Sequence, residues 1–384
     1  MESPILPRAE PASLDQVRFR RGCRAVARLW IAALTALSAL SVSPAFAAEI
    51  EGQVLGGGAP IARSTVTLWS AGSAAPAQLG QAQSGNDGRF TVGFQSRPEE
   101  TLYLVAKGGE PTARKGGDNP AIALMAVLGR NPPTHVTLNE FTTIASVWTH
   151  NQFIKGTAIN ANGNPLGLRI AAGNVPNFVD LRTGGWGAAI QGSLNSNQTQ
   201  TMANFATIAD ALSGCITRVT PDACASLFMA ATPPAGGAPT DTLAAAEAVA
   251  KYPWYQPARI FALLDKFYPI PHGKTLRPVP RMPYLSFAPS AWVLPLKFGG
   301  GGLNAPGKIM FDADGNAWTG VNFIVGSQAS DDLWDGNLAE FAPNGKALSP
   351  ETTGFQGGGI EGPGFAMAGF SSAAWPKFGP PYTL

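Results

Sequence analysis

Apolar and polar residues alternate with a period of two in short runs between residues 48 and about 133. The run TVTLW at 65–69 places Val66 and Leu68 on one face, as in a half-buried strand. The turn signal NDG at 86–88 precedes another alternating run, which indicates a hairpin. Further strands are expected at 101–106 and 121–128. Short strands at this spacing predict a small all-β sandwich over 48–133.

From residue 134 to 268 the apolar spacing becomes helical, which predicts a helical domain. The sequence TLNE at 137–140 has the form of a capping box before a first helix, and 201–212 carries an apolar stripe. Three more helices are expected, running from Thr220-Pro221 to Ala230, from Asp241 to before Pro253, and onward from Pro257. The Gly- and Asn-rich stretch 156–192 is expected to be irregular.

Residues 269–295 contain seven prolines. This density predicts an extended connector against a domain surface, with Tyr284, Phe287 and Trp292 as anchors. From Trp292 onward the pattern becomes β again. The whole chain is therefore expected to be multidomain α+β: a small all-β sandwich, then a helical domain, then a C-terminal β region over 296–384.

Composition narrows the possible classes of protein. The chain has 384 residues, including 45 Gly and 33 Pro, with 14% charged residues and a net charge of +2. Average proteins carry about 25% charged residues. Because the chain is so rich in Gly and Pro, a protein built only of long helices is excluded. Its small net charge excludes a strongly basic nucleic-acid binder.

The first 47 residues have the three parts of a secretory signal peptide. Five arginines between 18 and 28 precede an apolar run at 29–40, and Ala45-Phe46-Ala47 has the A-x-A form of a cleavage site. The apolar run is shorter than the roughly 20 residues of a membrane span. We expect an exported protein, periplasmic, at the cell surface or secreted, with no membrane span in the mature chain. The choice between the general secretory and twin-arginine routes stays open.

Two cysteines, Cys215 and Cys224, remain after cleavage. In an oxidising compartment, cysteines nine positions apart favour one local disulfide. A redox or metal role is disfavoured because there is no C-x-x-C motif and the histidines His135, His150 and His272 are scattered. His150 is interpreted as a core residue, since no nucleophile or carboxylate lies at a known catalytic spacing.

The N-terminal β region resembles a known family of accessory domains. Three segments carry the resemblance: GQV at 52–54, GAPIA at 58–62 before the strand at 66–68, and NDGRF at 86–90. They look like a carboxypeptidase regulatory-like domain, a transthyretin-like sandwich. The resemblance implies a non-catalytic module of 48–133 with a role in structure or adhesion.

The C-terminal region resembles the NHL-type β-propeller repeat of streptogramin B (virginiamycin B) lyase-like proteins. The matching repeat positions are Pro306, Gly307, Asp312, Gly315, Asn316 and Trp318. Residues 328–335 are expected to be an inserted loop, and a second repeat starts at 359–367 but lacks the D-x-x-G-N-x-W part. Because a propeller typically has four to eight blades, we expect an incomplete propeller over 296–384 in a truncated chain. The resemblance places the family's catalytic His and Glu in later blades, so no position here inherits them.

The loop 312–316 (DADGN) also has the oxygen-rich character of a calcium site. It lacks the downstream Glu of an EF-hand, and the propeller hairpin accounts for the same residues. The sequence therefore predicts no cofactor, with Ca²⁺ or Mg²⁺ as the alternative.

Taken together, the patterns favour an exported non-enzymatic protein with a surface or periplasmic binding or scaffold role, exerted through the incomplete β-propeller. Its ligand is unknown, with a carbohydrate or a protein as the classes considered, and nucleic acid is not expected. Enzymatic activity stays open, and the alternative is a truncated streptogramin B lyase-like C–O lyase without its catalytic blades. A third interpretation is a degraded gene product whose C-terminal part does not fold stably.

Overall fold

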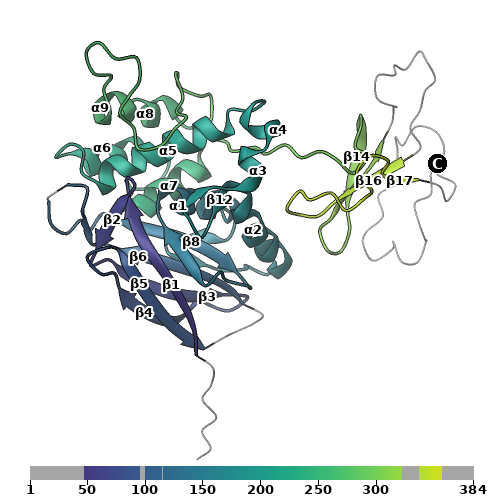
Figure 1. The fold of residues 1–384 in the computed structure, drawn as a ribbon, viewed down its shortest axis with the longest axis horizontal. Helices are drawn as coiled ribbons and strands as arrows, with labels where there is room; N and C mark the ends of the chain where they lie inside the picture. Colours follow the sequence, from purple (N-terminus) through teal and green to yellow (C-terminus); the bar gives the residue numbers. More distant parts are fainter. Residues whose placement is uncertain (1–46, 96–99, 115, 322–336, 357–384) are drawn as a thin grey trace, which may run out of the picture. The chain divides into compact units, whose positions relative to one another are not determined.

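The computed structural model describes residues 47–95, 100–114, 116–321 and 337–356 (Figure 1). The predicted signal peptide before residue 47, the predicted loop 328–335 and the predicted second repeat at 359–367 lie outside these ranges. The described chain is mixed α and β, with several antiparallel sheets and a set of helices. This confirms the α+β class, while a propeller remains a prediction.

Two sheets form the N-terminal β region, as the alternating pattern predicts. The first contains β5 (Arg89–Gln95), β1 (Ala47–Gly56), β2 (Ala59–Ala62) and β7 (Glu110–Pro111), with β9 (His135–Leu138) parallel to β1. The second contains β4 (Ala77–Gln83), β3 (Thr65–Ala71), β6 (Thr101–Lys107) and β8 (Ala123–Gly129). Val66 and Leu68 are both fully buried. Burial alternates along β3 and β5, whereas β6 and β8 are buried on both faces.

Nine helices follow within the described ranges, with short two-stranded ribbons between them. Their bounds are α1 Glu140–Thr149, α2 Pro165–Phe178, α3 Ala188–Gln191, α4 Ser193–Ser196, α5 Thr201–Ile216, α6 Ala223–Ala230, α7 Thr242–Lys251, α8 Pro257–Phe261 and α9 Leu263–Phe267. The ribbons are β10 Ile154–Lys155 with β11 Ala158–Ile159, and β12 Val179–Asp180 with β13 Gly185–Trp186. No helix in the described ranges combines the length and hydrophobicity needed to cross a membrane.

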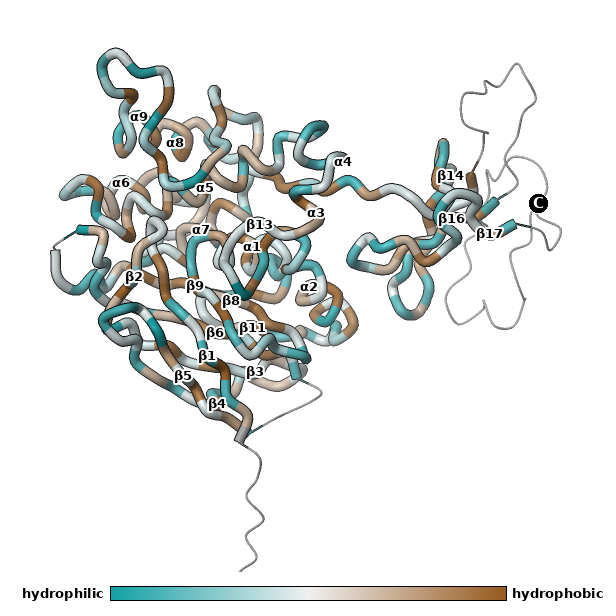
Figure 2. Tube along the Cα trace, viewed as in Figure 1, coloured by the Kyte–Doolittle hydropathy of each residue, from teal (hydrophilic) through white to brown (hydrophobic). Residues whose placement is uncertain are grey.

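Hydroxyl side chains of the helices pair with the edge strand of the second sheet, β8, which is buried. The edge strand β8 donates from Met125 N to Thr143 Oγ1 (3.0 Å) and from Val127 N to Ser146 Oγ (2.9 Å), both on α1. The hydroxyl of Thr242, on α7, accepts from Ala123 N. A bare sheet edge can pair with other chains. These hydroxyls satisfy that edge, and one hydrophobic core then extends from the sandwich through the helices to residues 285–294. Figure 2 shows hydrophobic residues along the strands and helices of this core.

The first helix begins later than the predicted capping box. Thr137 lies in β9, paired with Gln53 of β1, so it is strand and not helix cap. The N-cap is Asn139, whose side chain accepts from Thr142 N (3.0 Å) while Thr142 Oγ1 accepts from Asn139 N (2.9 Å). The capping-box assignment to residues 137 and 140 is therefore wrong, and Glu140 is available for other contacts.

The stretch 156–192 is not irregular, contrary to expectation, because it contains the 14-residue helix α2. Asn164 caps this helix by accepting from Gly167 N (2.8 Å), and Pro165 occupies its first turn. One side of the helix is buried, with Leu168, Ala172 and Val175 on it. The apolar stripe of α2 is short and lies among Gly and Asn residues, so it is hard to recognise in the sequence.

The remaining helix predictions agree with the structure apart from one cap and one break, since the single helix expected onward from Pro257 is divided at Ala262 into α8 and α9. Asp241 caps α7 and Pro257 opens α8, as predicted. The helix expected from Thr220-Pro221 starts later, because Asp222 occupies the N-cap position of α6.

The connector 269–295 lies antiparallel to α5, and side chains of α5 bond its main chain. Four polar side chains of α5, spaced three residues apart, bond main-chain groups of the connector. The pairs are Thr201 with Pro295 O, Asn204 with Val293 O, Thr207 with Leu285 N, and Asp210 with Arg281 N. We call this arrangement the α5 ladder.

The predicted anchors of the connector behave differently from one another. Trp292 is 1% exposed and is therefore an anchor. The Tyr284 hydroxyl accepts from Arg277 N (3.0 Å). Phe287 is 61% exposed, so its assignment as an anchor is wrong; Leu285 and Leu294 are buried instead.

The C-terminal strands form one antiparallel sheet with a small core of its own. Its order is β14 (Pro306–Phe311), β15 (Ala317–Val321), β16 (Asn337–Phe341) and β17 (Phe355–Gln356). Val321, Ala339 and Phe341 form that core. A four-stranded antiparallel sheet is the unit from which propellers are built, and the described residues of the C-terminal region contain one such sheet.

Candidate functional site

The two cysteines are joined in the structure, as predicted. Cys215 in the last turn of α5 and Cys224 at the start of α6 form a disulfide. The bond links these two helices, and Cys215 is fully buried. Its role here is structural.

The predicted repeat residues gather in one hairpin of the C-terminal sheet. Asp312 Oδ1 accepts from Asp314 N and Asn316 N, both at 2.9 Å, and Oδ2 accepts from Asn316 Nδ2 (2.9 Å) and Trp318 Nε1 (3.0 Å). Gly315 has a φ of 84° in the turn, which favours glycine. Pro306 and Gly307 lie at the start of the neighbouring strand, β14.

These contacts make Asp312 the centre of the hairpin. Partial burial disfavours its charged form, but the bonds donated by Trp318 and Asn316 outweigh burial and lower the pKa of Asp312. Both carboxylate oxygens accept N–H groups, as expected of a turn-forming aspartate. Across the described ranges, no group of three or more His, Cys, Asp or Glu side chains is placed to hold a metal ion.

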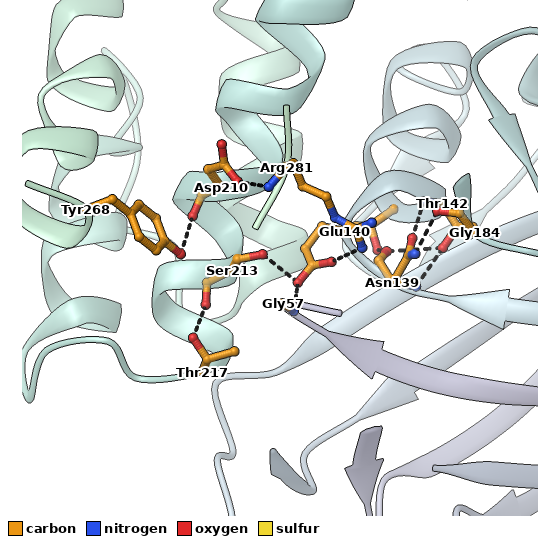
Figure 3. A network of polar contacts seen from close by, with 11 residues as sticks. Gly57, Asn139, Glu140, Thr142, Gly184, Asp210, Ser213, Thr217, Tyr268 and Arg281 are labelled. Carbon is orange, nitrogen blue, oxygen red and sulfur yellow. Dashed lines mark hydrogen bonds and ion pairs between the residues drawn. The ribbon is translucent and has the colours of Figure 1, made fainter. Parts of the chain in front are cut away.

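A buried polar network joins the β1–β2 turn, α1, α5 and the connector (Figure 3). At its centre is Glu140, which is fully buried at the start of α1. Its carboxylate accepts from Gly57 N (2.6 Å) and Ser213 Oγ (2.7 Å), and pairs with the Arg281 guanidinium at 3.1 Å. The guanidinium also lies over the Phe141 ring, 4.5 Å from its centroid, a cation–π contact.

Asp210 is the second carboxyl group of this network. Its Oδ1 accepts from Arg281 N at 2.9 Å, while Oδ2 is buried and meets no donor among the described residues. Burial, reinforced by the nearby charge of Glu140, raises the pKa of Asp210 to about 8. The Tyr268 hydroxyl donates to the main-chain oxygen of Asp210 (3.2 Å). The network thus ties the connector to the helices from two sides.

His150 is a buried core residue, as interpreted from the sequence. Its Nδ1 lies 3.0 Å from Ser146 O and 2.9 Å from Thr149 Oγ1. Burial lowers the pKa of His150 to about 4. Of the other histidines, His135 and His272 are both exposed. The structure does not bring the three histidines together.

The two buried titratable groups predict a specific dependence of stability on pH. Asp210 has a pKa raised from 3.8 to about 8, so the stability that it contributes is present at low pH and is lost as pH rises toward 8. His150 has a pKa lowered from 6.5 to about 4, so its contribution is present above 6.5 and is lost as pH falls toward 4. Between about pH 4 and pH 6.5, the contribution of Asp210 to stability therefore falls with pH while the contribution of His150 rises.

We therefore expect the free energy of unfolding to change little from pH 4 to 6.5 and to fall by about 2 kcal/mol from pH 6.5 to 8. Urea unfolding at four pH values measures this. Asp210→Asn should remove the fall above pH 6.5, whereas the exposed Asp314→Asn should retain it. An unchanged slope in Asp210→Asn would contradict the assignment.

An open groove of about 610 Å³ lies outside this network. It is bounded by the end of α1, by α2, and by Leu294 of the connector with Leu296 and Phe298 that follow it. Its lining is aromatic, aliphatic and amide-rich, and contains no Asp, Glu, Lys, Arg or His side chain. Among the lining residues are Trp148, Asn151, Gln152, Phe153, Asn164 and Phe178. We call it the amide groove.

None of these network and groove residues was predicted as a functional site from the sequence. Glu140 was assigned to a capping box, and Asp210 lies within the predicted apolar stripe of 201–212. A charged residue inside an apolar helical stripe is the signal that could have identified Asp210, since a buried charge needs a partner. No comparable local signal marks the amide groove, because its walls come from three separate segments.

Comparison with known proteins assigns no family to the chain. No protein-family model matches it, and no curated protein matches. Among solved structures, a 9R-lipoxygenase from Cyanothece PCC8801 is similar over 24% of this chain, with 16% sequence identity and a TM-score of 0.17. The match spans 15% of the lipoxygenase chain. A likeness of this extent assigns neither fold nor activity.

Proposed function

We propose that the protein is an exported, non-enzymatic binding protein that holds an uncharged polar ligand in the amide groove. The observation that carries this proposal is the lining of the groove, which combines aromatic surface with amide groups and has no ionisable side chain. Ligand sites are typically concave and largely apolar, with a few polar groups that orient the ligand.

The contacts of the titratable residues support a binding role over catalysis. A catalytic acid, base or nucleophile has to reach the substrate. Glu140 and Asp210 are fully buried in contacts that hold the connector, and His150 is fully buried at the end of α1. These three side chains therefore stabilise the fold. The side chains that line the groove can bind a ligand but include no ionisable group.

Export is supported by the signal-peptide pattern of residues 1–47 and by the Cys215–Cys224 disulfide. Disulfides persist mainly in oxidising compartments. We place the mature protein in the periplasm, at the cell surface or in the medium. The mass of the exported protein tests this point, because cleavage after Ala47 gives a chain that begins at Ala48.

The binding role is tested by saturation-transfer NMR with two matched sets of small molecules. One set is uncharged (neutral sugars, polyols and N-acetylated dipeptide amides), and the other is charged (uronic acids and free amino acids). We expect saturable binding from the uncharged set, lost in Gln152→Trp, which fills the groove. Gln198→Trp is the control, since Gln198 is an exposed amide outside the groove. Binding that survives Gln152→Trp, or that is confined to the charged set, would refute the proposal.

A further inference from the structure

A second pocket, of about 450 Å³, shares no lining residue with the amide groove. One of its walls is the end of β7 with the loop that follows, including Arg114, Gly116 and Gly117. The other wall is the turn between α5 and α6, including Arg218 and Val219. The lining contains two arginines and no acidic residue. We call it the arginine pocket.

Each arginine is held by main-chain groups of the opposite wall. The Arg114 guanidinium donates to Val219 O (3.3 Å). The Arg218 guanidinium donates in the other direction, to Gly116 O (2.6 Å) and to Asp118 O. Because Val219 and Gly116 both line the pocket, the two guanidinium groups lie at its walls. An arginine side chain has five N–H groups, so each retains donors beyond these bonds.

Neither of these two positive charges is neutralised by a carboxylate of the described chain. The ion pairs among the described residues include neither Arg114 nor Arg218. The carboxylates nearest to them in sequence bind other groups: Glu110 pairs with Arg63, Asp222 pairs with Lys266, and Asp118 accepts from Gly109 N (2.8 Å). A hollow lined by charge of one sign attracts ions of the opposite sign. The pocket therefore favours an anionic ligand.

The turn that carries Arg218 holds its backbone in an unusual conformation. Arg218 follows the C-cap of α5 and has a φ of 51°, in the left-handed region where glycine is the usual residue. An arginine adopts this conformation at a cost in stability. The Cys215–Cys224 disulfide closes the segment that contains the turn. Strained positions held by their surroundings are common at ligand sites, and this one fixes where the Arg218 side chain leaves the main chain.

The number of donors and charges indicates the kind of anion. The N–H groups of Gly116 and Gly117 have no acceptor among the described residues, so the wall offers them in addition to the guanidinium groups. A phosphate monoester carries between one and two negative charges at neutral pH and has three strong acceptor oxygens. A carboxylate has one charge and two oxygens. Two cations with several further donors suit the phosphate group better.

The volume and the remaining walls indicate that the anion is part of an organic molecule. Small-molecule sites typically have volumes of about 300–1,000 Å³, and this pocket of about 450 Å³ lies within that range. A water molecule occupies about 30 Å³ of the liquid, so a bare ion would leave most of the pocket to solvent. Pro111, Val219 and Pro221 add apolar surface to the walls.

We infer that the arginine pocket binds a small organic phosphate monoester. Arg114 and Arg218 contact the phosphate group, and the proline and valine side chains pack against the organic part. This inference goes beyond the proposed function, because the ligand is charged and its pocket is separate from the amide groove. The two sites can therefore be tested independently of each other.

Isothermal titration of the exported chain with phenyl phosphate tests the inference. We expect saturable binding, at least about fivefold tighter than that of inorganic phosphate, phenyl sulfate or benzoate. Arg114→Gln should weaken the binding of phenyl phosphate by about tenfold, the loss of a hydrogen bond to a charged group. Arg114→Lys keeps the charge without the planar fork and should bind with intermediate affinity. Arg259→Gln is the control, since Arg259 is an exposed arginine outside the pocket.

Arg114 is exposed, so both of its variants should unfold at the same urea concentration as the unmodified chain. If Arg114→Gln and Arg259→Gln weaken binding equally, the attraction is one of general surface charge and the pocket is not the site. If phenyl sulfate, benzoate or inorganic phosphate binds as tightly as phenyl phosphate, the ligand class is wrong. Gln152→Trp should leave the binding of phenyl phosphate unchanged; its loss in that variant would place the ligand in the amide groove and overturn the inference.

Discussion

Replacing Arg281 with Met is expected to lower the free energy of unfolding by about 3–5 kcal/mol. The substitution leaves the fully buried Glu140 carboxylate without its counter-charge. Breaking a buried ion pair from one side has a cost of this size. Arg281→Met also removes the cation–π contact with Phe141. Urea unfolding followed by far-ultraviolet circular dichroism measures the change.

Two further variants identify the cause of this loss. Arg259→Met removes an exposed arginine near the start of α8 and should change stability by less than about 0.5 kcal/mol. Glu140→Gln combined with Arg281→Met removes both charges, and the new side-chain amide keeps an oxygen that can accept from Gly57 N and Ser213 Oγ. The double variant should therefore be more stable than Arg281→Met alone. If Arg281→Met is as stable as Arg259→Met, the network contributes little and our interpretation of it is wrong.

Replacing Trp292 with Ala is expected to cost about 3–5 kcal/mol, the usual range for a buried Trp. The side chain is 1% exposed, and its Nε1 donates to Pro257 O (3.2 Å). The substitution opens a cavity where the connector meets α1 and α8. Thermal and urea unfolding both report the loss.

Phe287→Ala is the matched control, because Phe287 is an aromatic residue of the same connector and is 61% exposed. We expect a change within about 0.5 kcal/mol. Equal losses for Phe287→Ala and Trp292→Ala would mean that the connector is held in some way other than through Trp292.

The sequence predicted the elements whose signals are local. Alternation identified β3, Asp241 marked the start of α7, and the spacing of Cys215 and Cys224 indicated the disulfide. Each depends on residues a few positions apart, where side-chain direction follows directly from backbone geometry. The helix α2 was missed because its apolar residues lie among Gly and Asn.

The network and the groove could not be predicted because their members are distant in the chain. Arg281 lies 141 positions from Glu140, and no periodicity relates them. The same holds for the amide groove, where Leu294 faces residues of α1 and α2. Tertiary packing decides such pairings. A buried charge in the sequence indicates that a partner exists without indicating where it lies.

The α5 ladder has a consequence for how this protein can vary. Its hydrogen bonds end on main-chain atoms of the connector at residues 281, 285, 293 and 295. Main-chain groups are the same whatever side chain they carry, except that proline lacks the N–H group. The exposed connector side chains can therefore be exchanged while the docking is preserved. The segment is a point at which a different C-terminal module can be joined to the same body, provided that Arg281, Trp292 and the buried Leu285 and Leu294 are retained.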